Sequence, residues 1–156
     1  MNPTEPILHV ALVEPEIAPN VGTIARLCAA TGVRLHLIGK LGFQLTEKAL
    51  RRAGLDYWPA VDLEQHLSWD EFRLKYPQLH CIAFSAHSRM GYHQLNFQQH
   101  DCLVFGSETS GLPDALLQRV ETVTIPMPAG KVRCLNVASA VSIGVYEALR
   151  QLKQLG

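Results

Sequence analysis

The strongest constraint on the fold is an alternation of short apolar runs with longer segments of helical periodicity. The runs expected to form strands are residues 7–13, 33–38, 81–84, 101–105 and 122–125. The segments expected to form helices are residues 20–31, 46–53, 68–76 and 135–152. Strands that alternate with helices are typical of an α/β domain with a largely parallel sheet. We therefore predict a single α/β domain over residues 1–156, in which helices flank a mainly parallel sheet.

Polar residues and glycine mark the expected helix ends. Asn20 stands where the first helix needs an N-cap, and Gly32 follows its last residue. Ser68 and Glu71 have the spacing of a capping box at the start of the third helix. Asn136 opens the longest helix.

That last helix combines an apolar stripe with small residues. Its apolar residues recur at steps of three and four, which places them on one helical face. They are Leu135, Ala138, Val141, Val145, Leu149 and Leu152. The small residues that would let another helix approach closely are Ser139, Ala140, Ser142 and Gly144.

Composition excludes several classes of protein. No run of 18 or more apolar residues is present, so no membrane span is expected. The first six residues lack the basic segment and apolar core of a secretory signal, which favours a cytoplasmic protein. The 14 basic and 14 acidic residues cancel, so binding to nucleic acid would require local clusters of positive charge.

The cysteines and histidines lack the usual spacing of a metal site. Cys28, Cys81, Cys102 and Cys134 lie far apart and form no C-x-x-C pair. Free thiols are therefore expected rather than disulfides or zinc ligands. The seven histidines are scattered as well, and we predict no metal from their spacing.

Three segments that follow expected strands combine glycine, proline and polar residues. Ligands of a parallel sheet bind beyond the carboxyl ends of its strands, so chemistry is expected there. In the first segment, Asn20 stands at a helix start, where free N–H groups can meet an anion. Arg26 follows six residues later. A capped helix with a solvated arginine is the alternative interpretation.

The second segment, residues 104–113, runs from an apolar strand into Gly106, Glu108 and Gly111. Gly106 permits unusual backbone angles and close approach of a ligand, whereas Glu108 has no evident structural partner. An ordinary glycine-rich turn is the alternative. The chain contains no G-x-S-x-G elbow, no G-x-x-x-x-G-K-[ST] phosphate loop and no G-x-G-x-x-G fingerprint.

The third segment, residues 125–136, places Lys131 and Arg133 shortly before Asn136 and the long helix. A cationic loop beside a helix N-terminus can bind phosphate or carboxylate. A solvated basic loop is the alternative. Each of the three segments is a weak signal alone, but their combination and order are informative.

In this order, the three segments resemble the motifs of the SPOUT methyltransferases, which transfer methyl groups from S-adenosylmethionine to RNA. The N-x-G-x-x-x-R motif matches Asn20, Gly22 and Arg26. The G-x-E-x-x-G-L-P motif matches residues 106–113. The final motif, I-P-M followed by L-N-x-x-x-A, matches residues 125–127 and 135–140. The resemblance covers residues 7–153.

Two further stretches resemble one subgroup of these enzymes. Residues 51–57 read RRAGLDY and residues 145–148 read VYEA, as in the small bacterial tRNA 2′-O-methyltransferases of the wobble position. The resemblance implies that the substrate is the tRNA anticodon loop and that the target is the ribose of nucleotide 34, a cytidine or modified uridine. Unpaired RNA of this kind can be splayed out and read by a protein.

The resemblance also implies a deep C-terminal trefoil knot, a homodimer and S-adenosylmethionine as methyl donor. By their places in the motifs, Phe84, Gly106, Ile125 and Cys134 are expected to bind this cofactor. Relatives carry serine where this chain has Cys134, in a loop that is one residue longer here. A thiol is a weaker donor than a hydroxyl. The first helix and the small-residue face of the last helix are the expected dimer interface.

The same motifs imply that Arg26, Glu108 and Asn136 are catalytic. Arg26 matches the residue suggested as general base, but arginine is a poor base because its pKa lies above about 12. It would instead orient a phosphate or stabilise the developing alkoxide, or have its pKa lowered beside the sulfonium. Glu108 is expected to organise its loop, and Asn136 to cap the last helix while it holds substrate or loop. The residues expected to bind RNA are Asn20, Arg51, Arg52, Lys131 and Arg133.

Three other functions fit parts of the sequence. The same chemistry at another tRNA or rRNA ribose is the nearest alternative, although relatives with other targets tend to carry extra terminal RNA-binding segments. A non-catalytic RNA-binding module would fit if Cys134 marked decay of the site. A nicotinamide oxidoreductase fits the α/β pattern, but the chain lacks the glycine fingerprint that binds the dinucleotide.

Overall fold

The computed structural model of the chain describes residues 5–52 and 60–156. Within these residues, six parallel strands form one sheet in the order β3-β2-β1-β5-β4-β6. The strands are β1 His9–Val13, β2 Arg34–Ile38, β3 Leu63–His66, β4 Cys81–Phe84, β5 Cys102–Phe105 and β6 Glu121–Val123. The predicted α/β architecture with a mainly parallel sheet is confirmed.

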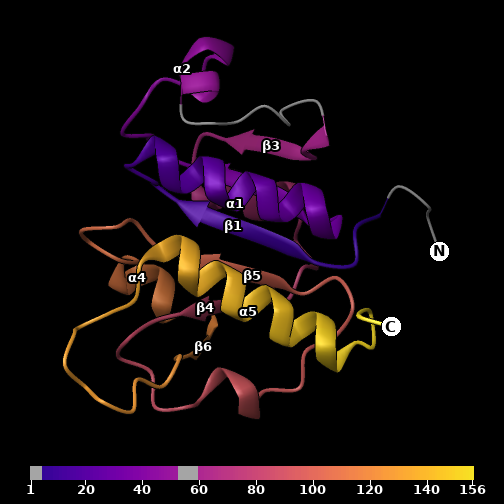
Figure 1. The fold of residues 1–156 in the computed structure, drawn as a ribbon, viewed down its shortest axis with the longest axis vertical. Coiled ribbons are helices and arrows are strands. Elements are labelled where there is room, and N and C mark those ends of the chain that lie inside the picture. Colours follow the sequence, from indigo (N-terminus) through magenta and orange to yellow (C-terminus); the bar gives the residue numbers. More distant parts are fainter. Residues whose placement is uncertain (1–4, 53–59) are drawn as a thin grey trace.

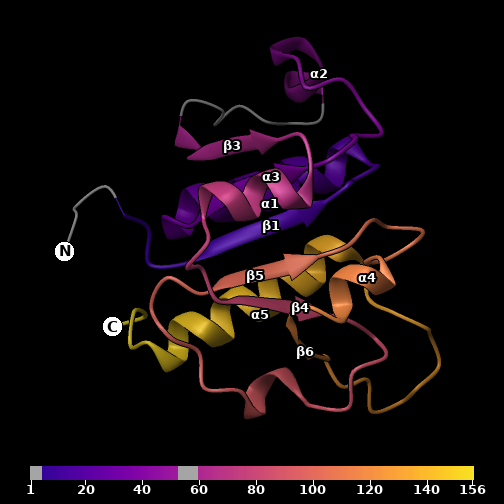
Figure 2. The same cartoon turned by 180° about the vertical axis from the view of Figure 1, so that it is seen from behind.

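Helices cover both faces of this sheet. They are α1 Ala18–Thr31, α2 Glu47–Arg52, α3 Trp69–Lys75, α4 Asp114–Leu117 and α5 Val137–Gln151, with a 3₁₀ turn η2 at Tyr92–Gln94. The helices α1 and α5 lie on one face (Figure 1), and α3 and α4 lie on the other (Figure 2). The short helix α2 lies beyond the β3 edge, at the opposite end of the sheet from β6 (Figure 1).

Alternate residues of the central strands feed two apolar cores. In β1, Val10 and Leu12 belong to the core with residues of α1 and α5, whereas Ala11 and Val13 belong to the core with Phe72 of α3. All five residues of β1 are buried. A parallel sheet that is covered on both faces needs apolar side chains on both. This explains why the central strands are continuous apolar runs.

Sequence patterns missed β3 and α4. The strand β3 reads LEQH and lies at an edge of the sheet, where only its last residue is buried, so it lacks an apolar run. The helix α4 spans four residues, which is too short for a helical period to be visible. The other predicted elements are present, with ends that differ from the predicted ones by up to two residues.

The start of α1 corrects the predicted role of Asn20. The helix begins at Ala18 after an N-cap at Ile17, which makes no side-chain cap hydrogen bond, and Pro19 lies in the first turn. Proline fits there because its φ is already helical and its missing N–H is not needed. Asn20 therefore lies inside the first turn, and its side chain bonds to other loops. The predicted end is confirmed, because Gly32 has φ 74° at the C-cap.

The other predicted caps are present. The Glu71 N–H donates to Ser68 Oγ at 3.1 Å, while the Glu71 carboxylate accepts from the N–H of Leu67, one residue before the cap. The Asn136 side chain accepts from the N–H groups at the start of α5, as predicted. Residue 53 of the predicted second helix and residues 53–57 of the RRAGLDY stretch lie outside the described residues.

The cysteines are free thiols, as predicted. Cys28, Cys81 and Cys102 are buried, and Cys134 is exposed. Burial raises the pKa of the Cys28 thiol to about 12, so it stays protonated. In the part of the chain that the structure describes, no helix has the length and apolar character needed to cross a bilayer.

Three buried histidines form a chain of hydrogen bonds across β1, β2 and β3. His9 Nδ1 lies 2.8 Å from His36 Nε2, and His36 Nδ1 lies 2.9 Å from His66 Nε2. A neutral imidazole offers one donor and one acceptor, so the chain is satisfied when all three rings are neutral. Burial, together with the charge of Arg34, lowers the pKa of His9 to about 4. Burial and His9 lower the pKa of His36 to about 3.

These pKa shifts predict that the protein loses stability in weak acid. Below pH 6.5, His9 and His36 bind protons in the unfolded chain but stay neutral in the folded chain. The free energy of unfolding therefore falls as the pH falls. The limiting slope is about 1.4 kcal/mol per pH unit for each histidine. Urea denaturation in metal-free buffer between pH 7.5 and 5 measures the loss. This window lies above the titration of ordinary carboxyls.

Two variants test the origin of the loss. His9→Gln should reduce the slope of the free energy of unfolding against pH by about the contribution of one histidine. Burial alone would lower the pKa of His80, but its hydrogen bonds to the carboxylates of Asp101 and Glu121 outweigh burial and raise that pKa. His80 therefore stabilises the folded state in acid, and His80→Gln should steepen the loss. A wild-type profile that is flat between pH 7 and 5 would contradict the assignment.

Candidate active site

The candidate site lies at the edge of the sheet where the parallel strands end. The helices α1 and α5 both begin at this edge, and the long segment between β6 and α5 lies there too (Figure 1). Three loops meet at it: residues 14–17 after β1, residues 106–113 after β5 and residues 124–136 after β6. The second motif and the I-P-M part of the third lie in these loops, whereas the first motif lies in α1, directly after the loop that follows β1.

Glu108 joins the loop after β5 to the loop after β1. Its carboxylate accepts hydrogen bonds from the N–H of Glu16 at 2.8 Å and of Ile17 at 3.3 Å, and from Asn20 Nδ2 at 3.4 Å. These N–H groups lie at the start of α1, where the helix has unpaired donors and a partial positive charge. A carboxylate is well suited to this place because it only accepts hydrogen bonds.

Asn20 and Asn136 extend this connection to the third loop. Asn136 Nδ2 donates to Asn20 Oδ1 at 3.2 Å. Asn136 Oδ1 accepts from the N–H groups of Ala138 at 2.8 Å and Ser139 at 3.3 Å, which caps α5. Glu108, Asn20 and Asn136 therefore form one hydrogen-bonded relay, called here the Glu108 relay, that ties the starts of both long helices to the loop after β5.

A second pair of contacts reinforces the connection. Glu16 Oε1 accepts from Thr109 Oγ1 at 2.6 Å and from the Thr109 N–H at 3.2 Å. These hydrogen bonds from Thr109 lower the pKa of the Glu16 carboxyl. Each loop thus supplies a carboxylate that accepts backbone N–H groups of the other, and the two loops hold one another in register.

The glycines of the second motif are needed by the loop itself. A Cβ on Gly106 would lie 2.2 Å from the carbonyl carbon of Gly111 and 2.4 Å from the nitrogen of Leu112. Gly111 has φ 67°, which favours glycine. Gly106 must therefore lack a side chain because the returning chain passes close to it. The expected approach of a ligand to its backbone stays a prediction.

Three of the four predicted cofactor residues follow adjacent strands. Phe84 ends β4, Gly106 follows β5 and Ile125 lies just past β6, and β5, β4 and β6 are neighbours in the sheet. Phe84 stacks on Phe105 with ring centroids 4.6 Å apart. Cys134 is exposed in the segment that leads to α5. The backbone of Phe84, Gly106 and Ile125 therefore lies at the ends of neighbouring strands. Cys134 lies further along the chain, in the segment between β6 and α5.

Gly144 corrects part of the interpretation of the last helix. A Cβ at this position would lie 2.9 Å from Phe84 Cζ, and the residue is buried. Its small size therefore makes room for Phe84 inside the protein rather than for a helix outside. Ser139, in contrast, is exposed on the same helix.

A cavity of about 360 Å³ opens beside the Glu108 relay. It is lined from the β1 side by Glu14 and Glu16, from the β2 side by Lys40 and Gly42, and from the second motif by residues such as Ser110. Glu14 has a left-handed backbone with φ 51°, an uncommon conformation for a residue other than glycine. The walls of this cavity carry both signs of charge.

A model of the SpoU rRNA Methylase family matches residues 7–146. The chain belongs to this family. A tRNA (cytidine(34)-2′-O)-methyltransferase of Saccharophagus degradans is 43% identical over 149 residues, 94% of this chain and 96% of the relative. A solved structure described as “Structural insights into the 2-OH methylation of C/U34 on tRNA” matches this chain with TM-score 0.88 and 48% sequence identity. The match covers 94% of this chain and 96% of the chain in that structure.

A more distant member was solved with the cofactor. The SpoU methyltransferase AviRb of Streptomyces viridochromogenes, in complex with AdoMet, matches with TM-score 0.82 and 26% identity. The match covers 96% of this chain and 59% of that one. The predicted membership in the SPOUT methyltransferases is thereby confirmed at the level of the family.

The predicted basic residues of this SpoU methylase lie in three separate places. Arg26 is exposed on α1, beyond Asn20. Arg51 and Arg52 are exposed in the last turn of α2, near the β3 edge. Lys131 and Arg133 are exposed in the loop before α5. The Glu108 relay brings together Asn20, Glu108 and Asn136 but includes none of these cations.

Glu16 and Thr109 are site residues that the sequence analysis missed. Glu16 follows an apolar strand in a loop at the carboxyl end of the sheet, the criterion that singled out Glu108. Thr109 lies inside the second motif. Their pairing is not visible in the sequence, because 93 residues separate them.

The cap on α5 gives a test of the relay's structural part. Asn136→Ala should lower the free energy of unfolding by about 1 kcal/mol, because two N–H groups lose their acceptor. Asn136→Asp keeps the acceptor and should be close to wild type, although it cannot donate to Asn20. Urea denaturation measures both, with Ser68→Ala on α3 as a matched loss of a cap. Unchanged stability of Asn136→Ala would contradict the role as a cap.

Proposed function

We propose that this chain transfers a methyl group from S-adenosylmethionine to the ribose 2′-hydroxyl of nucleotide 34 in the anticodon loop of tRNA. The observation that carries the proposal is the Glu108 relay, because it joins residues of all three motifs into one connected structure. Relatives that match over nearly their whole length bear the name of this activity. The target nucleotide and its ribose are taken from those relatives.

The residues at the ends of β4, β5 and β6 fit the cofactor. Phe84 and Ile125 offer apolar surface, and the backbone of three adjacent loops offers N–H and C=O groups at one edge of the sheet. S-adenosylmethionine supplies the methyl group on a sulfonium, which is a good leaving group. We assign Phe84, Gly106, Ile125 and Cys134 to its binding. The transfer itself uses no metal.

We further propose that the C-terminal part of the chain is knotted. The last residue of β6 and the residue after it are hydrogen-bonded to the loop after β4: the Ser85 N–H donates to Val123 O at 2.9 Å, and the Tyr92 N–H donates to Thr124 O at 2.8 Å. The Thr124 N–H in turn donates to Met90 O at 2.8 Å. These contacts support the proposal, because they hold the chain against that loop before it turns into α5.

The division of labour in the site follows from which side chains are already bound. Glu108 accepts three hydrogen bonds and Asn136 caps α5, so both hold loops in place. Arg26 lies on α1, whose first turn these contacts fix. We assign Arg26 to orienting a phosphate of the RNA or stabilising the alkoxide as the 2′-hydroxyl loses its proton. Alignment of the reacting groups supplies much of the acceleration.

We propose that the RNA is held by Asn20, Arg51, Arg52, Lys131 and Arg133, in a cytoplasmic homodimer. The net charge of one chain is zero, so RNA binding would depend on local clusters of cations. A homodimer would double the number of these clusters along the phosphate backbone. The exposed sides of α1 and α5 are the proposed interface. Tyr146, 45% exposed on α5, is the large side chain that such an interface would cover.

The deciding experiment is methyl transfer from labelled S-adenosylmethionine to unmethylated tRNA, followed by nucleoside mapping. Label at the ribose of nucleotide 34 supports the proposal. Label at another ribose of tRNA or rRNA would keep the chemistry and overturn the target. Cofactor binding without transfer to any supplied RNA would overturn the enzyme assignment in favour of an RNA-binding module.

Arg26 variants test its assigned role. Arg26→Ala should lower kcat by about 100-fold or more, as for loss of one positioned donor to a developing oxyanion. Arg26→Lys keeps a cation and should recover part of the rate with an unchanged pH profile. Arg119→Ala, an exposed arginine between α4 and β6, is the control and should match wild type. Full activity of Arg26→Ala would exclude the role.

A further inference from the structure

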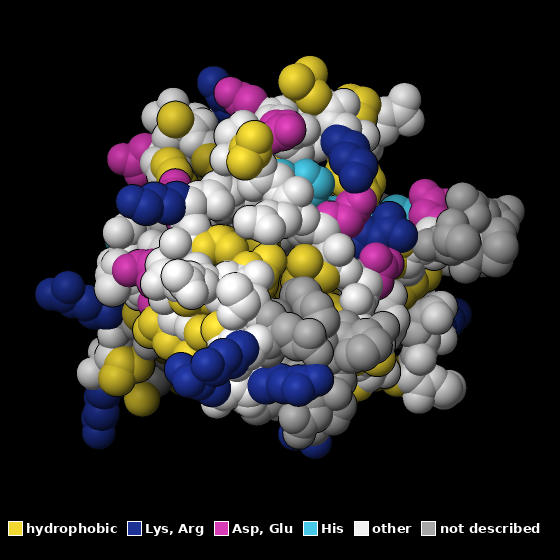
Figure 3. Space-filling view, turned by 90° about the horizontal axis from the view of Figure 1, so that it is seen from above, with side chains coloured by type: hydrophobic (Ala, Val, Ile, Leu, Met, Phe, Trp, Pro, Cys, Tyr) yellow, Lys and Arg dark blue, Asp and Glu magenta, His cyan; other side chains and the backbone are white. Residues whose placement is uncertain are grey.

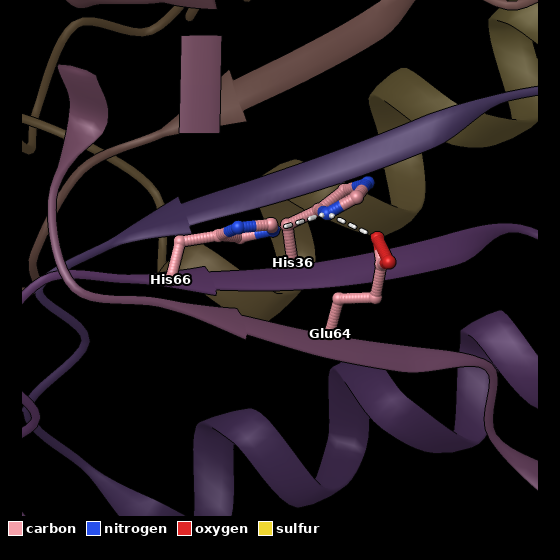
Figure 4. A group of neighbouring side chains, drawn as sticks. All are labelled: His36, Glu64 and His66. Carbon is pink, nitrogen blue, oxygen red and sulfur yellow. Dashed lines mark hydrogen bonds and ion pairs between the residues drawn. The ribbon is translucent and has the colours of Figure 1, made fainter. Parts of the chain in front are cut away.

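Two histidines and a glutamate converge between β2 and β3, away from the three loops of the candidate active site. Glu64 and His66 are two residues apart on β3, so their side chains share one face of the sheet. His36 on β2 is the register partner of Glu64. Figure 4 shows the three side chains pointing toward one another from the two strands. The sheet register therefore brings His36 next to two ligands that lie 28 and 30 residues further along the chain.

The separations of the three ligand atoms are close to those of a metal site. His36 Nδ1 lies 2.9 Å from His66 Nε2 and 3.6 Å from Glu64 Oε2. All three ligand atoms lie within 4.8 Å of one another. Ligands bound tetrahedrally at about 2.0–2.1 Å from zinc are about 3.3 Å apart. The largest gap closes by at most about 1.5 Å, a movement within reach of the partly exposed Glu64 side chain.

The chemistry of the three ligands fits zinc. Two imidazoles and one carboxylate form a donor set that zinc uses.

Neighbouring groups orient these ligands. His9 Nδ1 lies 2.8 Å from His36 Nε2, so it can accept the proton of that nitrogen while His36 Nδ1 faces the metal. Lys75 Nζ donates to Glu64 Oε1 at 2.7 Å, and the Tyr76 hydroxyl donates to Glu64 Oε2. Metal-binding histidines and carboxylates are held in this way by a second set of hydrogen bonds.

We propose that His36, Glu64 and His66 bind one zinc ion that joins the edge strand β3 to β2, with water in the fourth position. In the metal-free protein, the His66 Nε2 proton is donated to His36 Nδ1. Zinc takes the place of this hydrogen bond when His66 moves its proton from Nε2 to Nδ1. The bonds formed are two Zn–N bonds and one Zn–O bond, and no net proton is released.

The site has an open approach. His36 has no exposed surface, but Glu64 keeps 22% of its side chain exposed on the edge strand. Figure 3 looks onto the end of the molecule that carries α2 and β3, and histidine side chains reach the surface there between acidic and basic ones. Glu64 is therefore the ligand that an ion can reach from the β3 edge.

The test is a titration of the untagged, chelator-treated chain with Co²⁺ and then Zn²⁺. We expect one Co²⁺ per chain with the visible bands of a tetrahedral site, displaced by Zn²⁺, and a higher Tm with the metal. Calorimetry in buffers of different ionisation enthalpy should give the same heat, because no proton is released. Absence of stoichiometric binding would overturn the proposal.

Variants locate the site. Glu64→Gln and His66→Gln should each weaken binding by about 100-fold or more, and His9→Gln by about 10- to 100-fold. His80→Gln is the matched control, since His80 also contacts two carboxylates, Asp101 and Glu121, and should bind as wild type. The metal-free Tm of each variant shows whether it folds. Wild-type affinity in both folded ligand variants would overturn the proposal. No RNA or cofactor enters the test, so its outcome is independent of the proposed function.

Discussion

The carboxylate of Glu108 is the interaction on which the candidate site depends. It accepts N–H groups at the start of α1 from a loop that lies 92 residues further along the chain. Without a carboxylate there, the loop after β5 would have no strong acceptor for these donors, and unpaired donors at a helix start are costly. Through Asn20, the same contact reaches Asn136 and α5. One group therefore links the starts of both long helices to the loop after β5.

This dependence explains why the second motif contains two glycines. The loop must bring Glu108 to α1 and then return to α4 within a few residues. It does so by passing Gly111 and Leu112 so close to Gly106 that no Cβ fits. Close backbone packing and a left-handed turn are thus the cost of placing the carboxylate. The missing side chain at Gly106, which in the sequence suggests space for a ligand, makes space for the backbone of Gly111 and Leu112.

The sequence contains the local signals of this fold but not its long-range pairings. The strand β1 and the helix α5 could be predicted because apolar periodicity and the Asn136 cap are local properties. The strand β3 could not, because an edge strand with polar residues has no apolar run. The N-cap at Asn20 was wrong for a related reason: the side chain has better partners in Glu108 and Asn136 than in its own helix. Likewise, the register between β2 and β3 creates the His36–Glu64–His66 cluster, and this register cannot be read from the spacing of these residues in the sequence.

The hydrogen bonds of the relay also narrow where the proton of the ribose hydroxyl can go. A general base needs a free lone pair near the reacting oxygen. Glu108 accepts three hydrogen bonds through its two oxygens, and protonation would weaken the contacts that hold the start of α1. Asn136 is an amide whose oxygen caps α5, so it cannot take the proton either. The relay residues therefore act by holding the loops. The proposed role of Arg26 follows from this division: a cation would stabilise the developing charge, and Arg26 is the cation that the first motif places on α1.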